Sequence, residues 1–309
     1  MKILLTGASS FSGFWFARAL SEAGHDVVAP LRRAEASYIG DVRARRVQLL
    51  TKCARVIGPC EFGSDAFFDL IGSQPWDLLC HHAAYVEDYR SPSFNVAQAL
   101  AQNTYRLPDL LTEMANKGMR AVVLTGSVFE QNEGSGTAPL RAFSPYGLSK
   151  GFTAETFTYW CRELTLPLRK FVIPNPFGPL EEPRFCAYLI KCWKDAKTAE
   201  VRTPRYVRDN VPVDLLARCY AQYCAEAARE MTPSKRNPSC YVETQGAFTS
   251  RFSREIEKRL RIPCPYVLLN QTDNQEPFAR INTESALQFV PDWDETQSWD
   301  NIAAYYAES

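Results

Sequence analysis

A tyrosine and a lysine four residues apart are the side chains of this sequence best suited to proton transfer. They follow Ser144 and Pro145, a pair typical of the N-cap and first turn of a helix. Positions i and i+4 share one helix face, so Tyr146 and Lys150 project together. A phenol has an ordinary pKa near ~10, and a neighbouring ammonium group favours its phenolate form. We therefore expect Tyr146 to exchange a proton with a carbinol or carbonyl oxygen while Lys150 lowers the pKa of Tyr146 and binds a nicotinamide ribose.

A glycine-rich loop near the N-terminus is the second feature that could do chemistry. It spans residues 6–13 between an apolar strand pattern and an amphipathic helix pattern. In this setting Gly7 is expected to make a tight turn, and Gly13 to let the helix pack closely on the strand. The helix N-terminus would then offer its free N–H groups to a pyrophosphate. Ser9, Ser10 and Phe11 complete this predicted dinucleotide site, and Ser10 stands where a middle glycine is usual.

The end of the second predicted strand bears on the choice of dinucleotide. NAD sites place a carboxylate there for the ribose 2′-hydroxyl, whereas NADP sites place arginine. Here Leu31 is followed by Arg32 and Arg33, and no acidic residue lies between Leu31 and Glu35. Because arginine binds a phosphate with two parallel hydrogen bonds, the sequence favours NADP over NAD.

The elements that position these residues alternate between short apolar runs and helical patterns. This alternation predicts an α/β fold, a doubly wound Rossmann sheet of parallel strands, with a smaller C-terminal substrate-binding lobe. Pro108 should kink or split the longest helical stretch because it has no N–H. The expected strands are residues 2–5, 27–31, 54–57, 77–80, 122–124 and 168–173, and the expected helices are residues 11–23, 38–50, 93–116 and 145–164. We expect a dinucleotide-binding domain over residues 1–174, and a lobe over residues 175–309 that is interleaved with the end of the Rossmann sheet.

Taken together, these residues resemble the extended short-chain dehydrogenase/reductase family of nucleotide-sugar epimerases, dehydratases and reductases. The resemblance extends over nearly the whole chain. It rests on the loop, the Tyr146/Lys150 pair and three further segments, residues 77–84, 175–179 and 208–214. The resemblance implies further cofactor-binding residues, namely Ala83, Ala84, Asn103 and Pro174. It also implies that Asn175 and Arg208 bind substrate, and Arg280 is a further candidate for a diphosphate site.

The resemblance also implies a third catalytic residue, a hydroxyl side chain after the fifth strand. Matching Val128 and Phe129 to the family's Val-Tyr gives this role to Thr125, and a shift of the loop by two residues gives it to Ser127. The family's 4,6-dehydratases carry Asp and Glu directly after this threonine. Gly126 and Ser127 stand there instead, so water elimination has no evident acid–base pair.

We therefore expect an NADP(H)-dependent oxidoreductase that reduces a 4-keto group of a nucleotide-linked sugar, with Tyr146 as the general acid. One alternative is an NAD-dependent nucleotide-sugar 4-epimerase, which uses the same residues. A second alternative is a non-catalytic dinucleotide sensor, which would have no need of Tyr146, Lys150 and Thr125 together. The family's dimers pack through the helices that correspond to residues 93–116 and 145–164, so a homodimer is expected.

Composition narrows the remaining possibilities. The 309 residues include 35 basic and 35 acidic side chains, and this zero net charge argues against nucleic acid or an anionic membrane as the main partner. The sequence has neither a signal-peptide pattern nor an apolar stretch of ~18 residues, so we expect a cytoplasmic protein. Its ten cysteines include no Cys-x-x-Cys pattern, and we expect reduced, mostly buried thiols.

Three polar clusters have simpler interpretations. His81 and His82 are neighbours on a strand, so they should face opposite sides of the sheet and cannot share a metal, and no metal site is expected. The arginines at positions 43, 45 and 46 are expected to form an exposed helix face. Residues 87–90 either line the sugar site or form a solvated loop.

Overall fold

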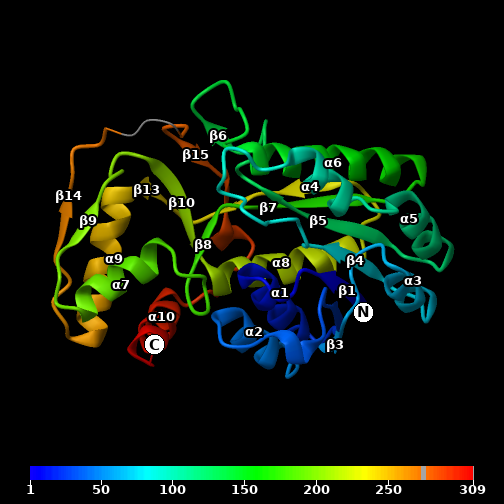
Figure 1. The fold of residues 1–309 in the computed structure, drawn as a ribbon, viewed down its shortest axis with the longest axis horizontal. Coiled ribbons are helices and arrows are strands. Elements are labelled where there is room, and N and C mark those ends of the chain that lie inside the picture. The colour runs from blue at the N-terminus through cyan, green and yellow to red at the C-terminus, as the bar shows by residue number, and fades with distance from the viewer. Residues whose placement is uncertain (273–275, 309) are drawn as a thin grey trace.

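A parallel sheet of seven strands lies at the centre of the protein (Figure 1). The computed structural model describes residues 1–272 and 276–308. All neighbouring strands of this sheet run parallel, which confirms the predicted doubly wound α/β class. In their order across the sheet the strands are β3 (Arg55–Ile57), β2 (Asp26–Pro30), β1 (Lys2–Thr6), β4 (Leu78–His81), β5 (Ala121–Ser127), β7 (Leu168–Ile173) and β11 (Ser234–Arg236). The order reverses between β1 and β4, where open α/β sheets bind their ligands.

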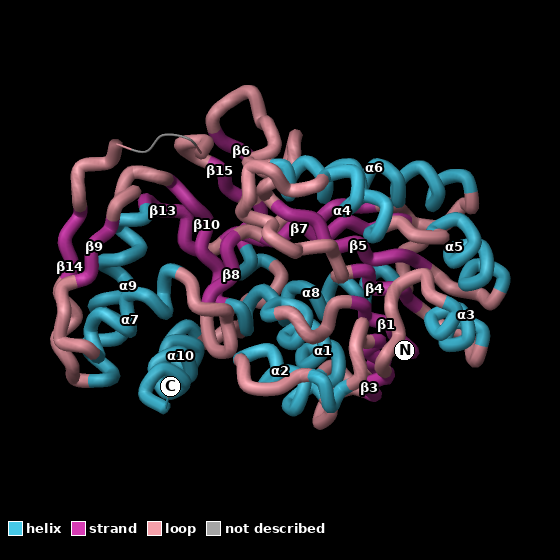
Figure 2. Tube along the Cα trace, viewed as in Figure 1, coloured by secondary structure: helices cyan, strands magenta, loops and turns pink. Residues whose placement is uncertain are grey.

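Helices cover both faces of this sheet (Figure 2). One face packs against α1 (Phe11–Glu22), α2 (Val42–Leu50) and α8 (Val213–Ala227). The other face packs against α3 (Asp65–Gly72), α5 (Leu107–Asn116) and α6 (Pro145–Glu163), and α4 (Val96–Asn103) lies against α6. Apolar side chains on alternate positions of each strand enter one cluster or the other, which explains the near-continuous apolar strand sequences.

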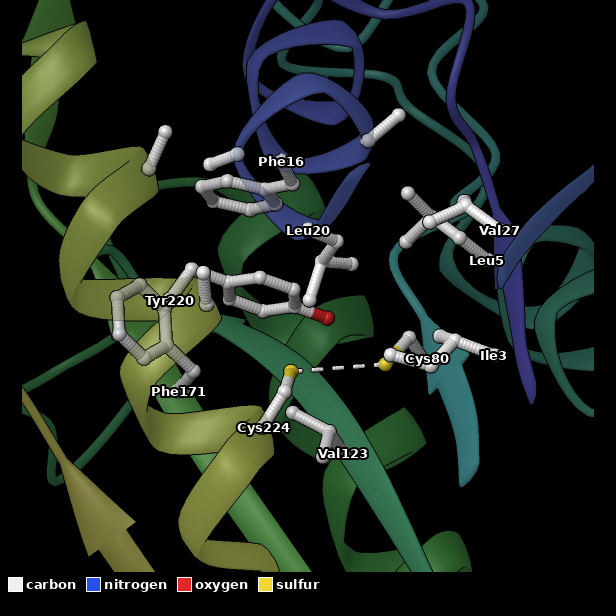
Figure 3. Close-up of a cluster of buried hydrophobic side chains, with 14 of the residues drawn as sticks. Ile3, Leu5, Phe16, Leu20, Val27, Cys80, Val123, Phe171, Tyr220 and Cys224 are labelled. Carbon is white, nitrogen blue, oxygen red and sulfur yellow. Dashed lines mark hydrogen bonds between the residues drawn. The ribbon is translucent and has the colours of Figure 1, made fainter. Parts of the chain in front are cut away.

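The core beneath α1 and α8 is rich in aromatic and sulfur-containing side chains (Figure 3). Phe16 stacks on Tyr220 with ring centroids 4.0 Å apart. The thiols of Cys80 and Cys224 lie 3.7 Å apart, from β4 and α8. Seven of the ten cysteines are buried, and all ten are free thiols. These thiols fill the core as small apolar groups, as expected.

Most predicted elements form close to their predicted bounds. The stretch at residues 93–116 splits into α4 and α5, and Pro108 lies in the first turn of α5. Arg106 adopts a left-handed backbone conformation with φ +51° at this break. The helix expected at residues 38–50 begins only at Val42, because Asp41 caps it. Helix α3 was not predicted.

The smaller lobe lies beyond the carboxyl ends of the strands. Its core brings together Phe177, Phe252 and Trp299 from three separate elements. Its helices are α7 (Phe185–Lys194), α9 (Gln245–Leu260) and α10 (Glu295–Glu308). Its strands are β8 (Asn175–Phe177), β9 (Ala199–Val201), β10 (Val207–Pro212), β12 (Pro238–Ser239), β13 (Tyr241–Thr244), β14 (Tyr266–Leu268), β15 (Arg280–Ile281) and β16 (Glu284–Ser285).

The two parts of the chain are interleaved. After β8 and β10 the chain returns to the large sheet as α8 and β11, and then re-enters the lobe. In the opposite direction, β6 (Ser135–Gly136), from the loop between β5 and α6, pairs with β15 of the lobe. Within residues 1–272 and 276–308, no helix is both long and apolar enough to cross a bilayer.

Candidate active site

The glycine-rich loop makes the close approaches predicted for it. Gly7 has φ +75°, and a Cβ atom there would lie 2.6 Å from the backbone nitrogen of Ala83. A Cβ atom at Gly13 would meet the carbonyl oxygen of Gly7. Both glycines are therefore needed for the turn and for the packing of α1 on β1 and β4.

Ser10 fits in place of the middle glycine because its side chain turns into the loop. Its hydroxyl donates to the Gly7 carbonyl at 2.8 Å and accepts from the backbone N–H of Gly13 as the N-cap of α1. His82 Nε2 lies 3.0 Å from this hydroxyl and 3.1 Å from that of Ser12. Burial and the nearby charge of Lys150 lower the pKa of His82 to about 3, so its imidazole is neutral. The unusual serine and the unusual histidine therefore contact each other.

The N-terminus of α1 keeps donors for an anionic ligand. Within the described part of the chain, no group accepts from the backbone N–H of Phe11 or Ser12. These groups, the helix dipole and the close-packed glycines fit the pyrophosphate of a dinucleotide. The backbone carbonyl of Ser9 accepts a hydrogen bond from Arg46 Nε at 3.0 Å, and this bond holds the loop in place.

Arg46 corrects the expectation of an exposed arginine face on α2. Its side chain is fully buried, and its guanidinium also donates to the Leu180 carbonyl at 2.7 Å and to the Glu182 carboxylate at 2.6 Å. The arginine pattern alone could not reveal this, since two of the three acceptors, Leu180 and Glu182, lie more than a hundred residues away in sequence. Arg46 thus joins the phosphate loop to the segment that enters the lobe.

The arginines after β2 are both engaged by neighbouring side chains. Arg32 forms an exposed ion pair with Glu61 at 3.0 Å, and Arg33 lies over the ring of Tyr38 at 4.7 Å. Leu31 is buried, with 2 % of its surface exposed. The position at which NAD sites carry an acid is therefore apolar, but the carboxylate of Glu61 lies beside Arg32.

The residues after β4 pack against the loop and α6. The backbone N–H of Ala83 donates to Thr6, and Ala84 follows it at the rim of the sheet. Asn103 accepts from the backbone N–H of Tyr85 at 2.7 Å and donates to Thr153 of α6. Its carboxamide therefore fixes the chain beside the expected cofactor position.

The two histidines at the end of β4 face opposite sides of the sheet, as predicted. His81 lies among Phe62 and Phe157, with ring centroids 4.4 Å and 4.9 Å away, while His82 lies against Phe16. Burial lowers the pKa of His81 to about 3, so this imidazole is also neutral.

Tyr146 and Lys150 lie on α6, and Ser144 caps that helix as predicted. The Lys150 ammonium group is buried and donates to the Thr125 carbonyl at 2.7 Å. The ring of Tyr146 is packed edge-on against Tyr89 and Phe94, with centroids 5.5 Å and 5.9 Å away. Tyr89 lies in the segment 87–90, so this segment reaches the candidate catalytic tyrosine.

The pKa of Tyr146 is raised, in contrast to the expected effect of Lys150. Burial is the main cause, and the carboxylate of Glu130 adds to it. The ammonium group is directed to the Thr125 carbonyl, and its own pKa is lowered by burial. Tyr146 is consequently a protonated phenol at neutral pH, which is the form that a general acid requires.

The two candidate hydroxyl residues differ in their surroundings. Thr125 lies two residues after Val123 on β5, so both side chains point to the face of the sheet that α1 and α8 cover. The Thr125 hydroxyl is directed into the core toward Tyr220, and it makes no hydrogen bond of good geometry there. Ser127 is the last residue of β5, and its hydroxyl accepts from the backbone N–H of Phe129 at 3.2 Å. Of the two, Ser127 lies nearer the end of the strand, where ligands bind in such sheets.

Sequence reasoning missed a buried ion network at this strand end. Glu130 is fully buried and accepts from the Ser127 backbone N–H at 2.7 Å and from Lys170 at 2.6 Å. Lys170 also pairs with Glu133, which pairs with Lys235. A Cβ atom on Gly126 would lie 2.5 Å from Cε of Lys170. The one sequence feature that could have indicated this network is Glu130 itself, an acidic residue directly after the apolar pair Val128 and Phe129 at the end of a predicted strand.

The predicted substrate-binding residues are dispersed around the lobe entrance. Pro174 connects β7 to β8, and Asn175, the first residue of β8, pairs with Asn210 of β10. Arg208 is buried, pairs with Glu276 at 2.7 Å and donates to the Pro277 carbonyl. A diphosphate could therefore reach Arg208 only in competition with Glu276.

Arg280 is bound differently from the prediction. Its guanidinium is 1 % exposed and donates to the backbone carbonyls of Val128, Glu130, Glu133 and Arg141. These four acceptors all belong to the loop between β5 and α6. Arg280 therefore fastens that loop to the lobe and does not present its charge to a ligand.

Comparison with known proteins gives a family and a set of similar folds. The family model described as the NAD dependent epimerase/dehydratase family matches residues 3–234. No curated protein matches the chain by sequence. A solved UDP-glucuronic acid 4-epimerase from Bacillus cereus, in complex with UDP-glucuronic acid and NAD, is 18% identical with a TM-score of 0.77, over 100% of this chain and 99% of that chain.

Two further solved structures are similar over the same span. A UDP-glucose-4-epimerase from Stenotrophomonas maltophila, with bound NAD and formylated UDP-arabinopyranose, is 17% identical with a TM-score of 0.78, over 100% of this chain and 98% of that chain. A dTDP-glucose 4,6-dehydratase from Streptomyces venezuelae is also 17% identical, with a TM-score of 0.73 over 100% and 98% of the two chains. At these identities the likeness establishes the fold.

Proposed function

The chain belongs to the NAD dependent epimerase/dehydratase family of enzymes, and from this premise we propose that it catalyses reversible oxidation and reduction at C4 of a nucleotide-linked sugar. Lys150 donates to the Thr125 carbonyl of β5, Tyr146 precedes it by one turn on the same helix, and the α1 N-terminus offers donors for a pyrophosphate. The proposal is that a dinucleotide lies between them, at the reversal of the strand order.

The observation that carries this proposal is that no acid–base pair follows either candidate hydroxyl residue, since Gly126 and Ser127 follow Thr125, and Val128 and Phe129 follow Ser127. A dehydratase needs a second acid–base pair to remove water from the sugar, and the family places it directly after the catalytic threonine. Here Lys170 fills the space beside Gly126, held by Glu130 and Glu133. Without that acid–base pair, we expect oxidation and reduction at C4 with no subsequent elimination of water from the sugar.

The chain's own residues would move the proton and position the sugar. In its phenolate form Tyr146 would take the proton of the C4 hydroxyl during oxidation, and as the resulting phenol it would return that proton to the C4 oxygen during reduction. Ser127 would hydrogen-bond the same oxygen, and Lys150 would contact the nicotinamide ribose. When bound, the nicotinamide would supply the hydride exchange at C4. Asn175 and Arg208 would hold the nucleotide diphosphate.

Within this chemistry, we favour a 4-epimerase that retains NAD. The family is described by its NAD dependence, and similar folds bind NAD with a UDP-sugar. The carboxylate of Glu61 next to Arg32 also reduces the positive charge available to a 2′-phosphate. An NADPH-dependent 4-keto reductase is the second candidate, because Arg32 and Arg33 follow an apolar Leu31.

The two candidates differ in what the purified protein retains. We would denature it, identify any released dinucleotide by mass spectrometry, and assay UDP-glucose and UDP-glucuronic acid for inversion at C4. Near-stoichiometric NAD with C4 inversion supports the epimerase. An empty protein that binds NADPH well above NADH, and inverts neither sugar, overturns it in favour of the reductase.

A further inference from the structure

The buried carboxylate of Glu130 is placed to act on three residues of the proposed site. One oxygen accepts from the backbone N–H of Ser127 at 2.7 Å, and the other accepts from the Lys170 ammonium group at 2.6 Å. The side chain is fully buried, so its charge is poorly screened by water. Both oxygens are thus engaged, which leaves Glu130 unsuited to proton transfer itself.

The charges around it form an alternating series. Lys170 of β7 lies between Glu130 and Glu133, and Lys235 of β11 pairs with the far oxygen of Glu133. Lys170 is itself largely buried beside Gly126, with 17% of its side chain exposed. Breaking such a buried pair by removing one partner leaves an uncompensated charge inside the protein. Glu130 therefore pairs directly with Lys170, and its negative charge also acts on the buried Lys150 ammonium group.

We propose that Glu130 is a positioning residue of this active site, which holds the Ser127 backbone and balances the positive charges of Lys170 and Lys150 at the end of β5. The inference rests on the proposed function for the roles of Ser127, Tyr146 and Lys150. Glu130 acts on the substrate only through these groups.

The effects on pKa agree with this geometry. Glu130 raises the pKa of Lys150 against burial and against Lys170, and it raises the pKa of Tyr146. The other groups that act on Tyr146 are Tyr89 from the loop after β4, which raises its pKa, and Arg184 from before α7, which lowers it. His81, the last residue of β4, and His82 directly after it also lie close enough to Lys150 for its charge to lower their pKa values. Removal of Glu130 should therefore lower the pKa of both Lys150 and Tyr146.

A substrate-free titration tests this directly. Protein labelled with 13Cε-lysine would be titrated by NMR, with the Lys150 resonance assigned from its loss in Lys150→Arg. In Glu130→Gln the Lys150 midpoint is expected to fall by about 1 pH unit or more, roughly tenfold in proton affinity. Glu133→Gln is the matched control, because it removes the other partner of Lys170 without contacting Ser127, and its Lys150 midpoint should stay within about 0.3 units.

Glu130→Asp guards against a variant that fails to fold, since it keeps the charge and should leave the Lys150 midpoint near that of the wild type. On UDP-glucose, Glu130→Gln should lower kcat about tenfold with little change in KM, and move the alkaline limb of the pH–rate profile to lower pH. An unchanged Lys150 midpoint in folded Glu130→Gln, or an equal shift in Glu133→Gln, overturns the proposal. Failure of the proposed function is distinguishable, because the wild type would then turn over no sugar while the Lys150 titration stays readable.

Discussion

At the scale of single residues, the phosphate loop shows how two departures from a sequence pattern compensate each other. Ser10 brings a hydroxyl into a position where glycine is usual, and His82 brings an imidazole that lies 3.0 Å from it. Each would lose one hydrogen-bond partner if the other were apolar, although Ser10 would keep Gly7 and His82 would keep Ser12. The sequence displays both residues, but their contact became evident only with the fold, because 72 positions separate them.

A double-mutant cycle on this pair should reveal coupling. Ser10→Ala and His82→Leu each remove a hydrogen bond, and each should lower the free energy of unfolding by about 1–2 kcal/mol. The double variant should lose about 0.5–1.5 kcal/mol less than the sum, measured by urea denaturation. Ser64 caps α3 in the same way without a histidine partner, so Ser64→Ala combined with His82→Leu should be additive. Additive losses for Ser10→Ala and His82→Leu would refute the coupling.

At the scale of elements, α2 does more than cover the sheet. Its buried Arg46 bonds the Ser9 carbonyl of the phosphate loop, and the Leu180 carbonyl and Glu182 carboxylate of the segment entering the lobe. One guanidinium therefore supports two segments that the proposed dinucleotide and sugar would contact. Neighbouring Arg45, by contrast, is half exposed and lies over the ring of Tyr305.

Replacing Arg46 with methionine should be costly at this junction. The change leaves two buried carbonyls and a carboxylate without their donor, so we expect a loss of about 2–4 kcal/mol in unfolding free energy. Dinucleotide affinity, measured by fluorescence titration with NADH, should fall as well because the loop loses its support. Arg45→Met is the control and should cost less than about 0.5 kcal/mol. Equal stability and equal NADH affinity in the two variants would remove Arg46 from this role.

How well the elements could be predicted depended on whether their signals were local. Ser144 and Pro145 specify the start of α6 in adjacent residues, and the structure confirms that start. By contrast, α3 spans only eight residues, too short to show a clear helical period. The roles of Glu130 and Arg280 depend on partners from distant elements, and no sequence pattern indicates those partners.

At the scale of the whole molecule, the C-terminal helix packs onto the segment between β8 and α7. Tyr306 of α10 donates to the buried carboxylate of Glu181 at 2.9 Å. Burial raises the pKa of Glu181 to about 7, above its ordinary value of 4.5. Because the pKa of Glu181 is higher in the folded protein than in the unfolded chain, the protonated carboxyl group stabilises the fold. This contribution to stability is fully present below about pH 4.5 and is lost as the pH rises through 7.

Glu181→Gln should therefore gain stability relative to the wild type as the pH is raised. We expect the difference in unfolding free energy to change by on the order of 2 kcal/mol between pH 5 and pH 8, in favour of the variant at high pH. Urea denaturation at several pH values measures it. A difference that is constant with pH would show that Glu181 is ionised throughout that range.

The homodimer remains a prediction at this scale. Phe152 and Tyr159 of α6 are 42% and 49% exposed and one heptad apart, so they lie near the same outer face. Light scattering should give twice the chain mass of 35.0 kDa for the wild type. Phe152→Lys with Tyr159→Lys should give a monomer, and Tyr188→Lys on α7 should not. A wild-type monomer would contradict the expectation.

The most direct test of the central claim follows the hydrogen at C4. UDP-glucose and UDP-glucuronic acid deuterated at C4 would be incubated with the protein and NAD, and the products analysed by NMR and mass spectrometry. The account predicts inversion at C4 with the deuterium retained, and a rate at least ~10²-fold lower in Tyr146→Phe. Inversion with loss of deuterium to solvent, or an undiminished rate in Tyr146→Phe, would contradict it.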